Sequence, residues 1–199
     1  MICERTSIDE AYVDITALAR GLLETWTGAS CGMESVVAAT ETDLLTGTHV
    51  VGMEQPAAVD WIHTVARDDE TTVNGNHTND RLLLAGAIVA ARLRQTIRDT
   101  LSYTLSAGIA HNKMLAKHAS GMHKPFQQTV VRTEAVPDLM ARTTIGQLNG
   151  FGGKKGIELE EQHGVRFVSD LQRFSLLQLQ RIFGAFKFAQ TTHDACRGI

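Results

Sequence analysis

The sequence has little cysteine, and its three residues, Cys3, Cys31 and Cys196, are widely spaced. They form neither a zinc-type CxxC pair nor the even framework of a disulfide-rich secreted domain, so all three are expected to be reduced thiols. The GxxxxGK[ST] loop and the GxSxG motif are also missing. Nothing in the sequence therefore supports a P-loop NTPase or a serine hydrolase.

Long hydrophobic runs are missing as well. The longest apolar stretch, from Leu82 to Ala91, is too short to cross a bilayer, and no basic region leads into a hydrophobic one at the N-terminus. The chain has 199 residues, of which 43% are hydrophobic and 21% charged. This composition predicts a folded intracellular protein without a membrane partner, built as one large domain or two small ones.

Charges of opposite sign are separated along the chain. Up to Asp80 there are 14 acidic and 3 basic residues, and from Arg81 onward there are 8 acidic and 16 basic residues. Such a division is typical of a chain that gathers cations at one place and polyanions at another. An acidic surface loop beside ordinary solvated helices would explain the same counts.

The apolar pattern of the first two thirds predicts a sheet packed by helices. Residues 2–16 predict extended structure that is interrupted at residues 7–10, and residues 42–48 and 68–79 predict loops around a helix over 57–66. Helical and β-type patterns then alternate: a long helix from Asn79 or Asp80 to Leu101, a strand over 103–109, a helix from His111 or Asn112 to Gly121, and a strand over 127–132.

After Thr133 the pattern changes to short helices separated by glycine-rich turns. Helices are expected over 137–142, 145–148, 157–163, 171–174 and 175–183. This change predicts a domain boundary near Thr133, with one domain over residues 1–132 and an all-helical domain over residues 133–199.

Asp9 and Glu10 are adjacent carboxylates between apolar residues. In a straight strand their side chains would point to opposite faces, but a bend would allow both to converge on one hard cation such as Mg²⁺. A solvated turn between strands is the simpler interpretation of such a pair.

Three lysines, Lys113, Lys117 and Lys124, follow the predicted strand over 103–109 and the helix after it. Lys113 and Lys117 are four residues apart and share a helix face, while Lys124 precedes Pro125 just past the expected helix end. Such ammonium groups can hold phosphates, and a solvated basic face would explain them nearly as well. The interleaved histidines are expected to be surface or nucleic-acid-facing residues: His111, His118 and His123.

Residues 149–156 form a turn with four glycines and two lysines ahead of a predicted helix. Glycine lets the backbone approach a phosphate closely, and the free N–H groups at a helix start favour an anion. A helix, a glycine turn and a helix commonly grip a DNA backbone without reading bases. A plain loop with glycine caps is the alternative.

Together these segments resemble the Y family of translesion DNA polymerases. The segment from Ser7 to Asp14 (SIDEAYVD) is similar to a palm motif of that family, and the segment from Ser106 to Lys117 (SAGIAHNKMLAK) is similar to its second palm motif. Lys124 falls where the family has a triphosphate-contacting lysine. The His-Asn-Lys sequence and the glycine turn are most similar to the eta branch.

The resemblance implies part of a right-hand polymerase of α+β class, with a palm whose sheet is mainly antiparallel and has helices on one face, followed by a small helical thumb. Asp9 and Glu10 would be the catalytic metal ligands for two Mg²⁺ ions, and Lys124 would hold the deoxynucleoside triphosphate. Primer-template DNA would be the second partner, a sliding clamp would bind through regions outside the chain, and the location would be the nucleus. The expected DNA-binding residues are Lys113, Lys117, Gly152, Gly153, Lys154, Lys155 and Gly156.

Some parts of the family pattern are missing from this sequence. The first metal-binding strand, the fingers and the little finger are not found in it, so little or no polymerase activity is expected from the chain alone. At Phe126 and Gln127 the family usually has asparagine and then a polar or small residue. Two alternatives stay open: a non-catalytic DNA-binding remnant that retains the thumb, and a polymerase of the kappa or iota type.

Overall fold

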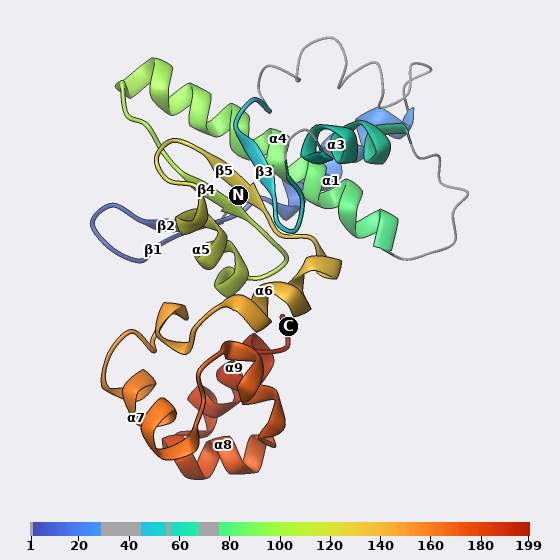
Figure 1. The fold of residues 1–199 in the computed structure, drawn as a ribbon. Coiled ribbons are helices and arrows are strands. Elements are labelled where there is room, and N and C mark those ends of the chain that lie inside the picture. Colours follow the sequence, from blue (N-terminus) through green and yellow to red (C-terminus); the bar gives the residue numbers. More distant parts are fainter. Residues whose placement is uncertain (1, 29–44, 55–56, 68–75) are drawn as a thin grey trace.

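A computed structural model describes residues 2–28, 45–54, 57–67 and 76–199 (Figure 1). Cys31, residues 42–44 of the first expected loop and residues 68–75 of the second lie outside the described residues. The sheet-containing half consists of β1 (Ile2–Arg5), β2 (Ala11–Asp14), α1 (Thr16–Gly28), β3 (Thr48–Val50), α3 (Ala57–Arg67), α4 (Asn76–Leu101), β4 (Ala107–Ile109), α5 (Lys113–Met122) and β5 (Gln128–Val130). The predicted α+β class is confirmed.

The second half is entirely helical within the described residues and lies below the first half in Figure 1. It consists of η1 (Thr133–Ala135), α6 (Val136–Arg142), η2 (Ile145–Gln147), α7 (Lys154–His163), η3 (Val168–Arg173), α8 (Leu176–Phe183) and α9 (Phe186–Ala195). No described helix is both long enough and apolar enough to span a membrane.

The strands form two small sheets. β1 and β2 pair antiparallel, with Ile2 opposite Asp14 and Arg5 opposite Ala11. The other sheet has the order β3-β5-β4 and is parallel throughout. This arrangement differs from the mainly antiparallel sheet that was expected. β4, α5 and β5 form a strand–helix–strand unit, in which the helix returns the chain to the end where the first strand began.

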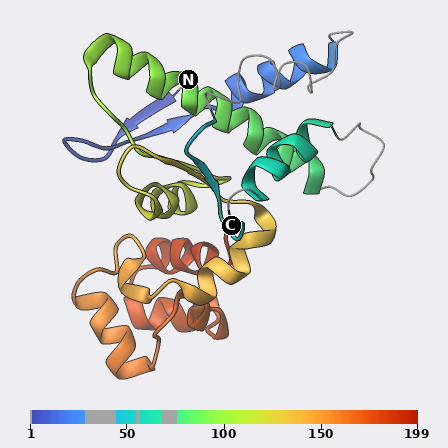
Figure 2. The ribbon, with the colours of Figure 1, turned by 45° about the horizontal axis from the view of Figure 1, so that its top comes forward.

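Two hydrophobic cores lie on opposite sides of the parallel sheet. On one side, α1 and α3 pack near α4, whose Leu84 and Ile88 are fully buried together with Val50 and Val130 of the strands. On the other side, α5 lies between the sheet and the helical half (Figure 2). Its Leu115 belongs to the core of the helical half. α5 therefore packs on both halves of the molecule.

Two hydrogen bonds reinforce the packing of α5 on the helical half. The side chain of Asn112, which caps α5, donates from Nδ2 to the carbonyl of Gly198 at 3.0 Å. His118 Nε2 lies 3.1 Å from Thr143 Oγ1. α5 thus contributes to the core of the second half although it precedes Thr133 in the sequence. The domain boundary near Thr133 stays a prediction.

Asp80 was expected at or beside the cap of the long helix, but α4 begins four residues earlier, at Asn76. Asp80 lies inside the helix and is buried. Its Oδ2 accepts hydrogen bonds from Arg132 Nε at 2.8 Å and from Trp61 Nε1 at 3.1 Å. The carboxylate thus joins α4 to α3 and to the chain after β5. A contact so distant in sequence is not visible in local capping patterns.

Candidate active site and nucleic-acid interface

Asp9 lies in the turn between β1 and β2, where the chain bends over residues 7–9. The carbonyl of Glu10 closes this turn by accepting hydrogen bonds from the N–H groups of Thr6 at 3.0 Å and Ser7 at 3.2 Å. The Ser7 hydroxyl donates to Asp9 Oδ1 at 2.8 Å. This bond, followed by a backbone hydrogen bond and the charges of Lys124 and Lys117, lowers the pKa of Asp9. The turn therefore keeps an exposed carboxylate ionised.

Replacing Ser7 with alanine is expected to raise the pKa of Asp9 toward its ordinary value, because the main hydrogen bond to the ionised form is lost. Asp9 in the variant will take up its proton at a higher pH, which a ¹³C NMR titration of the carboxyl groups measures. Asp14 is the internal control, since its low pKa comes from hydrogen bonds with Thr16. An unchanged Asp9 titration would show that the Ser7 hydrogen bond does not form in solution.

Glu10 forms an ion pair with Lys117 of α5. Both side chains are about one-third exposed, at 33% for Lys117 and 36% for Glu10. A second, more exposed ion pair joins Lys113 to Glu4, and the Lys113 ammonium lies 5.5 Å from the centre of the Tyr12 ring. The two lysines that were predicted to bind DNA thus connect α5 to the β1–β2 hairpin.

The two predicted metal ligands therefore take different partners, Ser7 for Asp9 and Lys117 for Glu10. Among the described residues, no cluster of three or more His, Cys, Asp or Glu side chains could hold a metal ion. The oxygen donors of Asp9 and Glu10 nevertheless match the chemistry that Mg²⁺ requires. A cation bound by both carboxylates would compete with the Lys117 ammonium for Glu10.

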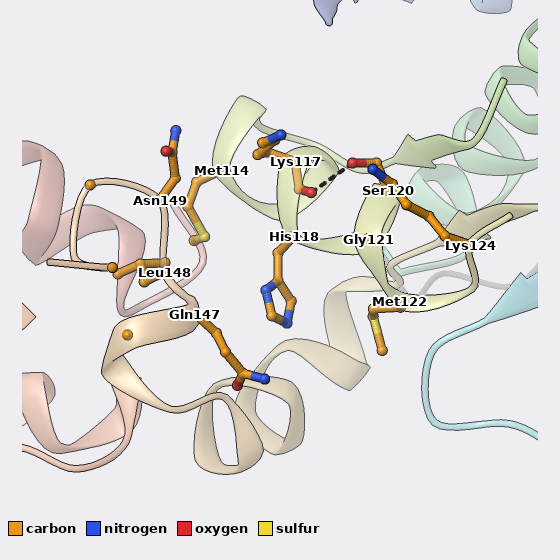
Figure 3. A pocket seen from close by; sticks show the side chains of 13 residues that line it. Met114, Lys117, His118, Ser120, Gly121, Met122, Lys124, Gln147, Leu148 and Asn149 are labelled. Atoms are coloured by element: carbon orange, nitrogen blue, oxygen red, sulfur yellow. Dashed lines mark hydrogen bonds between the residues drawn. The ribbon is translucent and has the colours of Figure 1, made fainter. Parts of the chain in front are cut away.

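Lys124 follows α5 in an exposed turn and precedes Pro125 through a cis peptide bond. Its charge contributes to the lowered pKa of Asp9, as does that of Lys117. Lys117 and Lys124 also line an open groove of about 500 Å³ between α5 and residues 146–152 (Figure 3). One wall of the groove therefore carries two ammonium groups, of which that of Lys117 is ion-paired with Glu10.

The opposite wall of the groove is built by the helical half. It includes Gln147 and Asn149 together with the glycine-rich turn at Gly150 and Gly152 (Figure 3). Gly150 has a φ of +90°, a backbone conformation that favours glycine. Amide side chains and a glycine turn facing two lysines make a surface suited to a sugar-phosphate chain.

The remaining residues of the predicted DNA-binding turn lie at the start of α7. A Cβ atom on Gly156 would stand 2.1 Å from the carbonyl oxygen of Phe151, so the turn closes only with glycine there. Gly153 is the N-cap residue of α7, and Lys154 is exposed. The Lys155 ammonium lies 3.8 Å from the centre of the Phe188 ring in α9. The structure thus brings Gly152, Lys117 and Lys124 to one groove and leaves Lys154 and Lys155 beside it.

His118, which was expected to be a surface or nucleic-acid-facing residue, is half-buried and lines the groove (Figure 3). The Thr143 hydroxyl donates to the Leu139 carbonyl at 2.7 Å, so His118 Nε2 acts as the donor toward Thr143. Burial lowers the pKa of His118, which favours the neutral ring. Its partner is 25 residues away in sequence, and no local pattern reveals such a contact. Ser7 could have been identified from the sequence more easily, because a serine two residues before an aspartate is a common turn signal.

Comparison with known proteins finds two families that match separate parts of the chain. Residues 2–121 match the impB/mucB/samB family, and residues 143–199 match the DNApol eta/Rev1 HhH motif. DNA polymerase eta of Arabidopsis thaliana is 40% identical over 186 residues, which cover 92% of this chain and 26% of the relative. DNA polymerase eta of Drosophila melanogaster is 34% identical over 197 residues, covering 92% and 21%.

A bacterial relative matches a shorter part of the chain. DNA polymerase IV of Serratia proteamaculans is 36% identical over 115 residues, which cover 58% of this chain and 32% of the relative. The chain therefore spans between about a fifth and a third of the length of these relatives. The resemblance seen in the sequence is confirmed: the chain belongs to the impB/mucB/samB family of Y-family DNA polymerases and is similar to its eta members.

Proposed function

We propose that this chain forms the palm and thumb of an eta-type translesion DNA polymerase that inserts deoxynucleotides opposite damaged template bases. The observation that carries the proposal is the groove lined by Lys117 and Lys124 on one side and by the Gly150–Gly152 turn on the other. The acidic turn with Asp9 and Glu10 lies beside its positive wall. Metal-binding carboxylates next to a phosphate-binding groove are what nucleotidyl transfer to DNA requires.

Each part of the site has a defined task in this proposal. Asp9 and Glu10 would hold two Mg²⁺ ions, which when bound would supply activation of the primer 3′-hydroxyl and stabilisation of negative charge on the triphosphate. Lys124 donates hydrogen bonds to the triphosphate of the incoming nucleotide. The backbone N–H groups of residues 152–156 bind phosphates of the DNA duplex.

The wider setting of the polymerase follows from the eta relatives. An enzyme of this type acts in DNA repair and damage tolerance and works in the nucleus. Primer-template DNA and deoxynucleoside triphosphates are its partners, and a sliding clamp binds through regions outside this chain. The identity of 40% and 34% with two eta polymerases over 92% of the chain supports the eta type.

The DNA-binding part of the proposal is tested with the double variant Lys154→Ala and Lys155→Ala. Its affinity for a primer-template duplex is expected to fall about tenfold, and the slope of log K against log salt to fall by about 2, since two phosphate contacts are lost. Fluorescence anisotropy over a salt series measures both quantities. The charge-matched control is Arg181→Ala with Lys187→Ala, two exposed residues of α8 and the α9 segment. Equal losses in both double variants would contradict a specific role for the glycine turn.

A non-catalytic DNA-binding protein is a second candidate function. It is favoured by one observation: Asp9 and Glu10 take different partners, Ser7 and Lys117. Both candidates predict DNA binding through the turn before α7. Only the polymerase requires Asp9, so primer extension separates the two.

A further inference from the structure

The position of the Lys124 ammonium group is not fixed by contacts of the lysine side chain. The residue is exposed, and within the described part of the chain its ammonium has neither a hydrogen-bond nor an ion-pair partner. A lysine side chain has four rotatable bonds and loses much conformational freedom when it is fixed on a ligand. Where the ammonium can reach is therefore set by the backbone on either side of Lys124.

On the N-terminal side, the backbone is anchored by His123. The His123 ring stacks on the ring of His49 in β3, with centroids 3.8 Å apart and planes 4° from parallel. Its Nδ1 lies 3.0 Å from the hydroxyl of Thr129, which is buried in β5. The residue that precedes Lys124 is thus held to two strands of the parallel sheet.

On the C-terminal side, the backbone is anchored by Phe126. The Phe126 carbonyl accepts a hydrogen bond from Arg94 Nη2 at 2.8 Å. The guanidinium groups of Arg94 and Arg98 lie 5.1 and 5.5 Å from the centre of the Phe126 ring. Arg94 is itself buried in α4 and donates to the Leu105 carbonyl at 2.9 Å and to Gln128 Oε1 at 3.2 Å. Phe126 is therefore attached to the rigid core through a fixed arginine.

We propose that His123 and Phe126 are positioning residues for Lys124, which hold the turn so that the ammonium is presented to a triphosphate. This inference rests on the proposed role of Lys124. The cation–π contacts of Phe126 with Arg94 and Arg98 anchor the turn locally. Fixing the turn before the nucleotide arrives reduces the ordering that binding must otherwise bring about, so the anchors increase affinity without touching the ligand.

The test uses the 199-residue chain and inorganic tripolyphosphate, followed in ¹⁵N NMR spectra through the backbone amide signals of the groove residues Lys117, Ser120 and Gly152, which every variant retains. Phe126→Leu removes both cation–π contacts and is expected to weaken tripolyphosphate binding about fivefold, whereas Phe126→Tyr retains an aromatic face and is expected to stay within about twofold. His123→Leu, which removes the stacking and the hydrogen bond, is also expected to weaken binding about fivefold. Melting temperatures are measured for every variant.

The control is Phe167→Leu, which removes an Arg166–Phe167 contact of 5.5 Å in the helical half and is expected to leave the affinity unchanged. If Phe126→Leu and His123→Leu lower the melting temperature but bind tripolyphosphate as the unmodified chain does, the positioning role is overturned. Lys124→Ala keeps the two failures apart. If it binds as tightly as the unmodified chain, the role of Lys124 in the proposed function is wrong, whatever the anchors do.

Discussion

Replacing Gly108 with alanine is expected to lower the free energy of unfolding by about 3 kcal/mol, the upper range for overpacking a core. A Cβ atom at this position in β4 would stand 1.9 Å from the Ala116 carbonyl oxygen and 2.5 Å from the Ser120 nitrogen. Both atoms belong to the backbone of α5, so no side chain can turn aside. The helix would have to move off the sheet, and urea unfolding followed by circular dichroism measures the loss.

Gly121→Ala is the matched control, because Gly121 lies in α5 itself and a Cβ atom there would meet nothing within 4 Å. Alanine is the better helix former, so this variant is expected to be as stable as the unmodified chain or up to about 1 kcal/mol more stable. A similar loss in both variants would mean that α5 tolerates no change at all. A Gly108→Ala variant with unchanged stability would contradict the close packing of α5 on β4.

Long, periodic elements were predictable from the sequence, and short ones were not. The spacing of apolar residues indicated the long helix that became α4. The glycine turn indicated a helix after it, but α7 begins at Lys154, three residues before the expected start at Ile157. β3 has only three residues, too few to show a period, and its first residue fell in an expected loop. The strand expected over 103–109 shrinks to Ala107–Ile109, and Tyr103 is 68% exposed. The β-forming residues alone therefore did not determine the bounds of this strand, because pairing with β5 decides where it begins and ends.

The candidate site was predictable as a set of residues but not as a geometry. The motifs indicated Asp9, Glu10 and Lys124, and in the structure the charge of Lys124 contributes to the lowered pKa of Asp9. The partner of Glu10 was not predictable, because Lys117 is 107 residues away in sequence. The groove needs α5 and residues 146–152 to face each other, which depends on the packing of Leu115 in the second core. Tertiary packing is the step that a local pattern does not contain.

Asp9→Asn is expected to lower the rate of primer extension about 1000-fold, which corresponds to about 4 kcal/mol of transition-state stabilisation. The substitution keeps the size and the acceptor oxygen that Ser7 uses, but it removes the charge that binds a divalent cation. The assay uses a chimera in which this chain replaces the matching 26% of the Arabidopsis relative. Asp14→Asn is the control, since Asp14 lies exposed on the same hairpin and accepts a hydrogen bond from the Thr16 N–H at 2.9 Å.

Asp9 is a cleaner test than Glu10, because Glu10→Gln would also leave Lys117 without its ion-pair partner. That variant changes the positive charge facing the groove at the same time as it removes a carboxylate. With Asp9→Asn, the ion pair between α5 and the hairpin stays intact, so a loss of extension with unchanged DNA affinity is assigned to the metal site. An active chimera that keeps its rate in Asp9→Asn would contradict the metal assignment. A folded chimera that binds DNA and extends no primer would favour the non-catalytic function, because the thumb surface would then work without the chemistry.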